Sequence, residues 1–173
     1  MELSTAISLI QKPFEHPERS QTWADLGAGG GLFTTALATL LGTSGKIFAV
    51  DKDHYPEIKS HDGMAEVVRV QKDFISDDLG FHNLDGILIA NALHYVNDKK
   101  SYLLTLSGMI KKSGKLIVVE YDTLQSNTWV PYPLSFDAFT TLAEDIKIGA
   151  PVLLGQVPSR YHGNGIYAAL VNL

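Results

Sequence analysis

The fold is decided by one stretch of sequence, Thr22-Trp23-Ala24-Asp25-Leu26-Gly27-Ala28-Gly29-Gly30-Gly31, and by the apolar-periodic segment Leu32 to Leu41 that follows it. A strand predicted over 22–26 runs into a glycine-rich turn, and the turn runs into a helix predicted over 31–41. Glycine permits left-handed backbone angles and the close approach of a ligand, while the first helical turn presents unpaired N–H groups at its positive end. The stretch therefore predicts a parallel-sheet protein with a nucleotide-like ligand at this turn.

The spacing of the glycines argues against a dinucleotide as that ligand. A dinucleotide site has the spacing G-x-G-x-x-G, whereas Leu32 stands at the third glycine position here. Asp25 places a carboxylate near the end of the strand, which suits the cationic end of a ligand. The run from Asp25 to Gly31 resembles the first motif of class I S-adenosylmethionine-dependent methyltransferases, whose ligand carries an amino group and a sulfonium but no phosphate. A tight turn without a ligand is the structural alternative.

Composition limits the chain to a single domain. Its 173 residues, 45% of them hydrophobic, are expected to form one methyltransferase domain over 1–173, with 1–20 as an N-terminal helical extension. The lack of cysteine excludes disulfides and thiolate ligands, and no metal site is predicted. A net charge of −5 with no basic cluster argues against nucleic-acid binding. Because no apolar run approaches the roughly 18 residues of a membrane span, we expect a soluble, cytoplasmic protein without membrane contact.

Short apolar runs alternate with helix-length segments along the chain, which is typical of βαβ units and a parallel sheet. Strands are predicted over 22–26, 46–51, 67–71, 85–90, 115–120, 152–157 and 166–171, with the last two flanking a long-looped hairpin. Helices are predicted over 3–12, 31–41, 99–110 and 135–147, and one short helix within 54–66. The resemblance implies an α/β fold, a Rossmann-like doubly wound sheet of seven mostly parallel strands with an antiparallel terminal strand.

Open α/β sheets bind ligands at the carboxyl ends of their strands. Asp51 ends the second strand and can accept hydrogen bonds from both hydroxyls of a ribose, in adenosine or in NAD alike. By the resemblance, Asp73 would accept from the adenine amine, with Phe74 beside the base. A polar turn at Asp51 and a helix cap at Asp73 are the alternatives. The residues predicted to hold S-adenosylmethionine are Asp25, Gly27, Ala28, Gly29, Gly31, Asp51, Lys52, Asp73, Phe74 and Asn91.

Residues 91–96 resemble the segment that lines the methyl-transfer locus in small-molecule methyltransferases. His94 is the candidate general base, because histidine titrates near neutral pH and a base is needed where the acceptor must lose a proton. A capping or structural role for His94 is left open. Acceptor contacts are expected where segments 94–95, 120–122, 127–133 and 160–162 converge. They are Tyr95, Glu120, Trp129, Tyr132, Arg160 and His162.

An NAD(P)-dependent short-chain oxidoreductase is the competing enzyme class. Tyr95 and Lys99 form its Y-x-x-x-K pattern, and Asn91 is similar to the asparagine that follows a strand in that family. However, the family carries the tyrosine and lysine on a later helix with a serine about a dozen residues upstream, and here position 82 is His82. The position of the pattern therefore argues against this class.

The prediction is a methyltransferase that uses S-adenosylmethionine, yields S-adenosylhomocysteine, and methylates oxygen, nitrogen or carbon of a small molecule. No Asn/Asp-Pro-Pro-aromatic sequence follows the fourth predicted strand, which disfavours methylation of exocyclic base or amide nitrogens. Without cysteine, cytosine C5 methylation by its usual covalent route is impossible. A catalytically silent cofactor-binding or interaction module is the alternative, and a homo-oligomer is left open.

Overall fold

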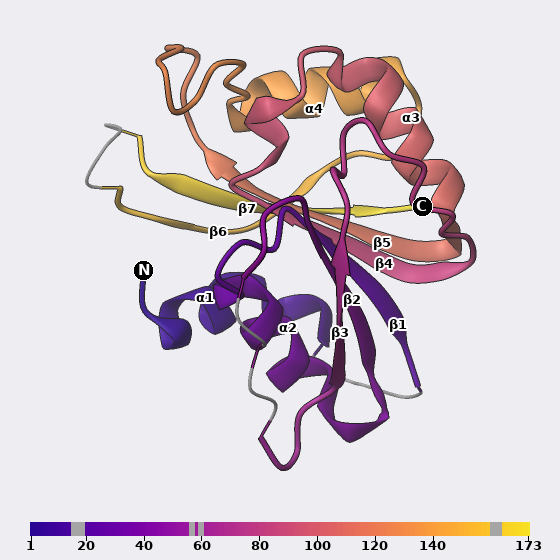
Figure 1. Cartoon of the computed structure of the whole chain (residues 1–173). Coiled ribbons are helices and arrows are strands. Elements are labelled where there is room, and N and C mark those ends of the chain that lie inside the picture. Colours follow the sequence, from indigo (N-terminus) through magenta and orange to yellow (C-terminus); the bar gives the residue numbers. More distant parts are fainter. Residues whose placement is uncertain (15–19, 56–57, 59–60, 160–163) are drawn as a thin grey trace.

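Seven segments of the chain pair into one sheet in the order β3-β2-β1-β4-β5-β7-β6 (Figure 1). The computed structural model describes residues 1–14, 20–55, 58, 61–159 and 164–173. Four of the six strand pairings are parallel, and β7 runs antiparallel to both β5 and β6. The predicted fold class is therefore confirmed. The strands are β1 (Thr22–Leu26), β2 (Lys46–Asp51), β3 (Glu66–Gln71), β4 (Leu84–Ala90), β5 (Ile110–Tyr121), β6 (Val152–Val157) and β7 (Ile166–Asn172).

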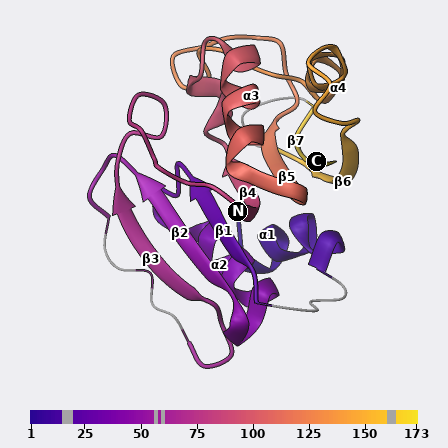
Figure 2. The same ribbon diagram turned by 90° about the vertical axis from the view of Figure 1, so that its right-hand side faces the viewer.

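Helices cover both faces of the sheet, with α1 and α2 on one side and α3 and α4 on the other (Figure 2). The α-helices are α1 (Leu3–Ile10), α2 (Leu32–Leu41), α3 (Lys99–Met109) and α4 (Phe136–Asp145), and the short 3-10 helices are η1 (Lys12–Phe14), η2 (Gly42–Ser44) and η3 (Leu93–Tyr95). None of the described helices has the length and apolar character that a membrane-spanning segment needs.

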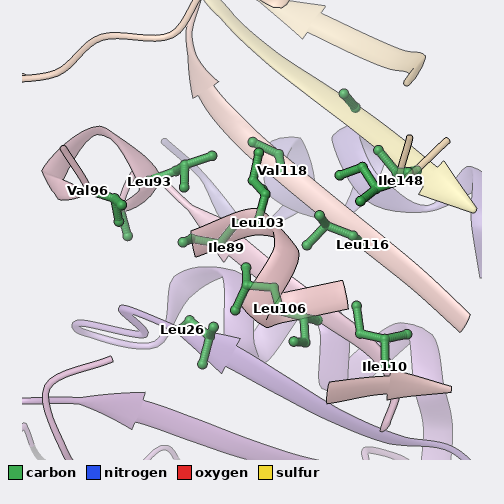
Figure 3. Packing of buried hydrophobic residues seen from close by; sticks show 14 of the residues in the cluster. Leu26, Ile89, Leu93, Val96, Leu103, Leu106, Ile110, Leu116, Val118 and Ile148 are labelled. Atoms are coloured by element: carbon green, nitrogen blue, oxygen red, sulfur yellow. The ribbon is translucent and has the colours of Figure 1, made fainter. Parts of the chain in front are cut away.

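Alternation along the strands divides the buried side chains between two cores. Trp23 and Leu88 face α1 and α2, whereas Ala24 and Ile89, the next residues along the same strands, face α3 and α4. Figure 3 shows the second core, in which Leu103 of α3 lies among residues of β4 and β5. Burial on both faces of the central strands explains why their sequences are continuously apolar.

Two predicted elements differ from the structure. The helix predicted within 54–66 is absent from the described residues of that segment, 54–55, 58 and 61–66. The fifth strand begins at Ile110 instead of residue 115, because Ile110 pairs with Leu84 across a register shift in the β4–β5 ladder. Lys111 and Lys112, which look like a solvated helix end in the sequence, therefore belong to the first part of the strand.

The packing of β1 on β4 generates a stability prediction. Trp23 is fully buried opposite Gly86, and a Cβ at Gly86 would lie 2.4 Å from its ring. Gly86→Ala should lower the free energy of unfolding by about 1–3 kcal/mol through overpacking. Gly108→Ala is the matched control, because a Cβ there meets no atom within 4 Å in the exposed part of α3. This control should raise stability by up to about 1 kcal/mol.

Urea denaturation followed by circular dichroism measures both variants. Equal changes of the same sign in the free energy of unfolding of Gly86→Ala and Gly108→Ala would show that the ring of Trp23 does not constrain position 86.

Candidate functional site

The glycine turn after β1 lies across the carboxyl ends of β1, β2 and β3. The Gly27 and Ala28 N–H groups both donate to the Val50 carbonyl, at 2.9 and 3.0 Å. The Gly29 N–H donates to Asp51 Oδ2 at 2.8 Å, and Arg69 Nη1 of β3 donates to the Gly29 carbonyl at 3.0 Å. Three neighbouring strands therefore fix the turn.

Glycine is required at two positions of this turn for different reasons. Gly27 has a φ of +76°, and a Cβ there would lie 2.5 Å from the Cβ of Ala92, in the segment that follows β4. Gly29 has a φ of +50°, and a Cβ there would meet nothing within 4 Å, because it would point into open space beside a cavity. The first glycine allows close packing of the two loops, and the second leaves room for a ligand.

That cavity has a volume of about 410 Å³ and lies between the turn and the loops that follow β2, β3 and β4. We call it the cofactor cavity. Seven of the ten residues predicted to hold S-adenosylmethionine contribute to its wall. The lining residues are Gly27, Gly29, Asp51, Lys52, Asp53, Tyr55, Asp73, Phe74, Ile75, Asn91, Ala92 and Tyr95.

Two of the three carboxylates that line the cofactor cavity, Asp51 and Asp73, are partly engaged by backbone donors. Asp51 accepts from Gly29 N and, at 3.0 Å, from Asp53 N, while Asp73 accepts from Ile75 N at 2.9 Å. The polar turn that was the alternative for Asp51 is thus present, whereas Asp73 accepts from a turn and not from the start of a helix. Each carboxylate oxygen keeps a second lone pair, so these contacts hold the groups in place without preventing hydrogen bonds to a ribose or an amine.

Asp25, Ala28 and Gly31 were predicted to contact the cofactor, but they do not line the cavity. Asp25 is 1% exposed and accepts a hydrogen bond of 2.5 Å from Thr34 Oγ1 of α2, so it ties the strand to the helix. Burial raises the pKa of the Asp25 carboxyl from 3.8 to about 6, against the lowering effects of the Thr34 hydrogen bond and the Arg69 charge. The Ala28 N–H donates to the Val50 carbonyl of β2, and Gly31 is the N-cap residue of α2.

Asn91 stands where three cavities meet. It follows β4 with a left-handed φ of +50°, and its N–H donates to the Val119 carbonyl at 2.8 Å. Its Oδ1 is buried and has no hydrogen-bond partner within the described part of the chain. Such an unsatisfied acceptor costs about 1–3 kcal/mol. An ammonium group bound between the cavities would satisfy it, so the residues present fit a ligand with a cationic end.

The second of these cavities, which we call the acceptor cavity, has a volume of about 710 Å³. It is lined by Asn91, His94, Tyr95, Tyr121, Asn127, Trp129 and Val130. The third, about 730 Å³, lies next to it between α1, the start of α2 and the β6–β7 end of the sheet, and shares Asn91 and Tyr121 with it. Asn91 and Tyr95 line both the cofactor cavity and the acceptor cavity, so the two spaces adjoin.

His94 and Glu120 form a buried pair behind the acceptor cavity. Their side chains are 3% and 1% exposed, and His94 Nδ1 lies 2.9 Å from Glu120 Oε2 and 3.1 Å from Oε1. The carboxylate also accepts from His94 N at 3.1 Å and Tyr121 N at 3.2 Å. With its Nδ1–H donated to a carboxylate, a neutral imidazole presents the lone pair of Nε2. Nε2 makes no hydrogen bond to the described residues, and His94 lines the cavity.

Glu120 and Tyr132 were predicted to contact the acceptor, but neither lines the acceptor cavity. Glu120 faces inward behind His94, because it shares the inner face of β5 with Leu116 and Val118. Tyr132 lies over Lys99, whose Nζ is 5.6 Å from the ring, and is not part of the cavity wall. Tyr95 and Trp129 do line the cavity. Arg160 and His162 lie outside the described residues.

Lys99 is turned away from the cavities. It is 8% exposed, its Nζ donates to the Val96 carbonyl at 2.7 Å, and burial lowers its pKa while the charge of Glu120 opposes the change. Lys99 lines neither the cofactor nor the acceptor cavity, so the Y-x-x-x-K pattern does not bring Tyr95 and Lys99 together there.

Among the described residues no cluster of three or more histidine, aspartate or glutamate side chains is arranged to hold a metal ion.

Arg69 and Tyr55 were not identified from the sequence as site residues. Arg69 lies at position 4 of a strand, where only its pairing opposite Ala49 shows that it reaches the glycine turn. Its guanidinium carbon is 5.7 Å from the centre of the Tyr55 ring, which lines the cofactor cavity. No local sequence signal marks either residue.

A seven-stranded sheet of this order, with cavities at the carboxyl ends of β1 and β4, defines a Rossmann-like protein of the class I methyltransferase type. Residues 24–118, more than half of the chain, match the family model described as a methyltransferase domain. The chain therefore belongs to the family of class I S-adenosylmethionine-dependent methyltransferases. No curated protein matches it in sequence.

Solved structures with the same fold include several methyltransferases. An arsenic(III) S-adenosylmethionine methyltransferase from Chlamydomonas reinhardtii has a TM-score of 0.65 at 13% identity, covering 99% of this chain and 72% of that one. An S-adenosylmethionine-dependent methyltransferase from Aquifex aeolicus has a TM-score of 0.57 at 16% identity, with coverages of 99% and 98%. Magnesium protoporphyrin IX methyltransferase from Synechocystis PCC 6803, solved with bound S-adenosylmethionine, has a TM-score of 0.66 at 10% identity, with coverages of 98% and 78%.

The buried carboxyl of Asp25 predicts a particular pH dependence of stability. Its pKa is about 6 in the folded protein, above the ordinary value of 3.8. The folded state therefore keeps a proton that the unfolded chain releases, and stability falls as the pH rises from about 4 to about 6, by roughly 3 kcal/mol at most. Asp25→Asn cannot ionise, so its stability relative to the natural protein should rise by about that amount over this window.

Urea unfolding of both proteins at pH 4, 5, 6 and 7 measures the difference. A stability difference that stays constant across these four pH values would contradict the raised pKa.

Proposed function

We propose that this protein transfers a methyl group from S-adenosylmethionine to a small-molecule acceptor, with His94 as the general base. The observation that carries the proposal is the junction at Asn91. A cavity with the carboxylates Asp51 and Asp73 adjoins there a second cavity that is lined by His94, whose Nδ1 is paired with the buried Glu120. Family membership implies the cofactor.

The residues of the cofactor cavity fit the chemical groups of S-adenosylmethionine. Asp51 would accept hydrogen bonds from the ribose hydroxyls and Asp73 from the adenine amine, with Phe74 beside the base. The unpartnered Oδ1 of Asn91 would accept from the α-ammonium group. When bound, the cofactor supplies a methyl group on a sulfonium, and the position of Asn91 would bring that end to the border of the acceptor cavity.

Methyl transfer is a displacement in which positioning supplies most of the rate. The acceptor atom forms a bond to the methyl carbon while the bond from that carbon to sulfur breaks and its electron pair stays on sulfur. His94 Nε2 takes the proton that the acceptor loses, and Glu120 stabilises the imidazolium through Nδ1. The proton then leaves His94 to water.

A catalytically silent cofactor-binding protein is the second candidate. One feature favours it: the acceptor cavity is open, and Trp129 on its wall is 79% exposed. Incubation with methyl-labelled S-adenosylmethionine and a panel of phenols, amines and carbon acids distinguishes the two. Label in any acceptor excludes the silent protein, whereas cofactor binding without transfer to any of them would favour it.

Cofactor binding is tested at Gly29, with Gly30 as the matched control. A Cβ at either residue meets nothing within 4 Å, but only Gly29 lines the cofactor cavity. Gly29→Leu should abolish the binding of S-adenosylmethionine and S-adenosylhomocysteine, since its side chain fills the cavity, and Gly30→Leu should keep it.

Calorimetric titration of the natural protein and both variants with these ligands, and with NAD, provides the measurement. Equal affinities of Gly29→Leu and Gly30→Leu would show that the glycine turn is not part of the cofactor site. Binding of NAD alone would favour the NAD(P)-dependent oxidoreductase.

The role of His94 is tested by His94→Gln, with His82→Gln on an exposed loop as the control. The rate of methyl transfer to an acceptor found in the panel should fall by about 10²- to 10⁴-fold in His94→Gln, because general base catalysis contributes that much. Affinity for S-adenosylhomocysteine should stay unchanged in both variants.

Glu120→Gln should lower the same rate by about 10- to 100-fold, since it acts through the orientation and charge of His94. Single-turnover transfer of labelled methyl measures these rates. Full activity of His94→Gln would assign His94 the structural role.

A further inference from the structure

We propose that the acceptor is a flat, uncharged aromatic molecule with a weakly acidic hydroxyl group, a phenol in chemical class, and that it stacks on Trp129. This inference rests on the methyl transfer proposed above and names the substrate class of the same site. Three properties of the acceptor cavity carry it: its walls, its lack of charge and its base.

The walls of the acceptor cavity are aromatic on several sides. Tyr95 of η3 and Tyr121 at the end of β5 flank His94, with ring centroids 4.3 and 6.1 Å from the imidazole. Trp129 and Val130 come from the segment that follows β5. Aromatic rings in offset-stacked or edge-to-face arrangements favour a flat aromatic guest. The volume of about 710 Å³ lies within the usual range for small-molecule sites.

The acceptor cavity also differs from the cofactor cavity in charge. Among its described lining residues none carries a permanent charge, whereas Asp51, Lys52, Asp53 and Asp73 line the cofactor cavity. Glu120 lies behind His94 and is only 1% exposed. A charged acceptor would lose hydration on entering the acceptor cavity and would find no partner of opposite charge in its wall, which is costly. An uncharged acceptor has no such cost.

The candidate base, His94, favours one class of uncharged acceptor over the others. A neutral amine has a free lone pair and attacks without losing a proton first, whereas a phenol is a strong nucleophile only as its hydroxyl proton leaves. His94 Nε2 takes that proton, the phenolic oxygen bonds to the methyl carbon, and the products are an aryl methyl ether and S-adenosylhomocysteine. A site that presents a histidine held by a carboxylate therefore suits a hydroxyl acceptor.

Trp129 provides a direct reporter of acceptor binding. Its backbone is fixed, because its N–H donates to Asn127 Oδ1 at 2.8 Å, while its side chain is 79% exposed over the cavity. The chain has two tryptophans, and the other, Trp23, is fully buried with its Nε1 bonded to Gln21 Oε1 at 2.9 Å. An acceptor that stacks on Trp129 should therefore affect one indole and leave the other unchanged.

The test uses nitrogen-15 labelled protein saturated with S-adenosylhomocysteine, in which Trp129→Phe assigns the two indole N–H signals. The probes are 2-naphthol, 2-naphthoate and 2-naphthylmethylammonium, which share one ring system and differ in charge. Titration with 2-naphthol should shift the Trp129 signal and not that of Trp23. The two charged probes should bind at least about tenfold more weakly.

Equal or tighter binding of either charged probe, or no shift of Trp129 with any probe, would overturn the inference. The Gly29 amide signal in the same sample reports the binding of S-adenosylhomocysteine. If the Gly29 signal does not shift when S-adenosylhomocysteine is added, the result counts against the proposed function. A failure of this inference and a failure of the proposed function are therefore distinguishable.

Trp129→Ala should weaken 2-naphthol binding by up to about tenfold, because the stacking contact with the indole ring is lost. Leu124→Ala is the matched control, because Leu124 is 72% exposed in the same segment and does not line the acceptor cavity. Equal loss in both variants would overturn the role of Trp129. His94→Gln should keep 2-naphthol binding and lose formation of 2-methoxynaphthalene from added S-adenosylmethionine.

Discussion

The cavities of this protein exist because β1 pairs in parallel with β2 on one side and with β4 on the other. The chain leaves β1 through α2 toward β2 and returns only later to β4, so the loops after β1 and β4 diverge at the carboxyl edge of the sheet. That divergence opens the crevice in which ligands of doubly wound sheets bind. The pairing in turn requires Gly86 beside the buried ring of Trp23, and it requires Gly27 where the two loops touch at Ala92. The site therefore depends on how closely two neighbouring strands and their loops can approach.

Two energetically unfavourable features of this arrangement occur at Asn91. A non-glycine residue with a left-handed φ is strained, and a buried oxygen without a hydrogen-bond partner is destabilising. Among the described residues, both features occur together at Asn91, which borders all three cavities. The strand ladder holds it there through the hydrogen bond from its N–H to Val119. A site that is preorganised in this way need not reorganise when a cationic group arrives.

The sequence predicted the strands and the glycine turn well, because burial on both faces makes the central strands continuously apolar and the turn needs glycine. It predicted the direction of individual side chains less well. Asp25 alternates with Ala24 and Leu26 and so faces α2, and Glu120 shares the inner face of β5 with Val118. Strict alternation along each strand could have found both. The contact of Arg69 with Gly29 could not be found this way, since it depends on the register of β3 against β2.

The His94–Glu120 pair is hard to explain by stability alone. Apolar residues of similar size would fill the same space beside α3 at lower cost, because a buried charged pair is often no more stable than its apolar replacement. Lys99 lies in the same region, and burial lowers its pKa while the charge of Glu120 raises it, so the two groups interact electrostatically. Burial and the charges of Glu120 and Asp122 likewise raise the pKa of Tyr167 above its ordinary range. Lys99, Tyr167 and His94 thus all interact with the one carboxylate of Glu120. A core that keeps these ionisable groups together departs from the best packing, and it does so where a proton acceptor borders a cavity. Functional sites are expected to depart from the rules of stability in this way.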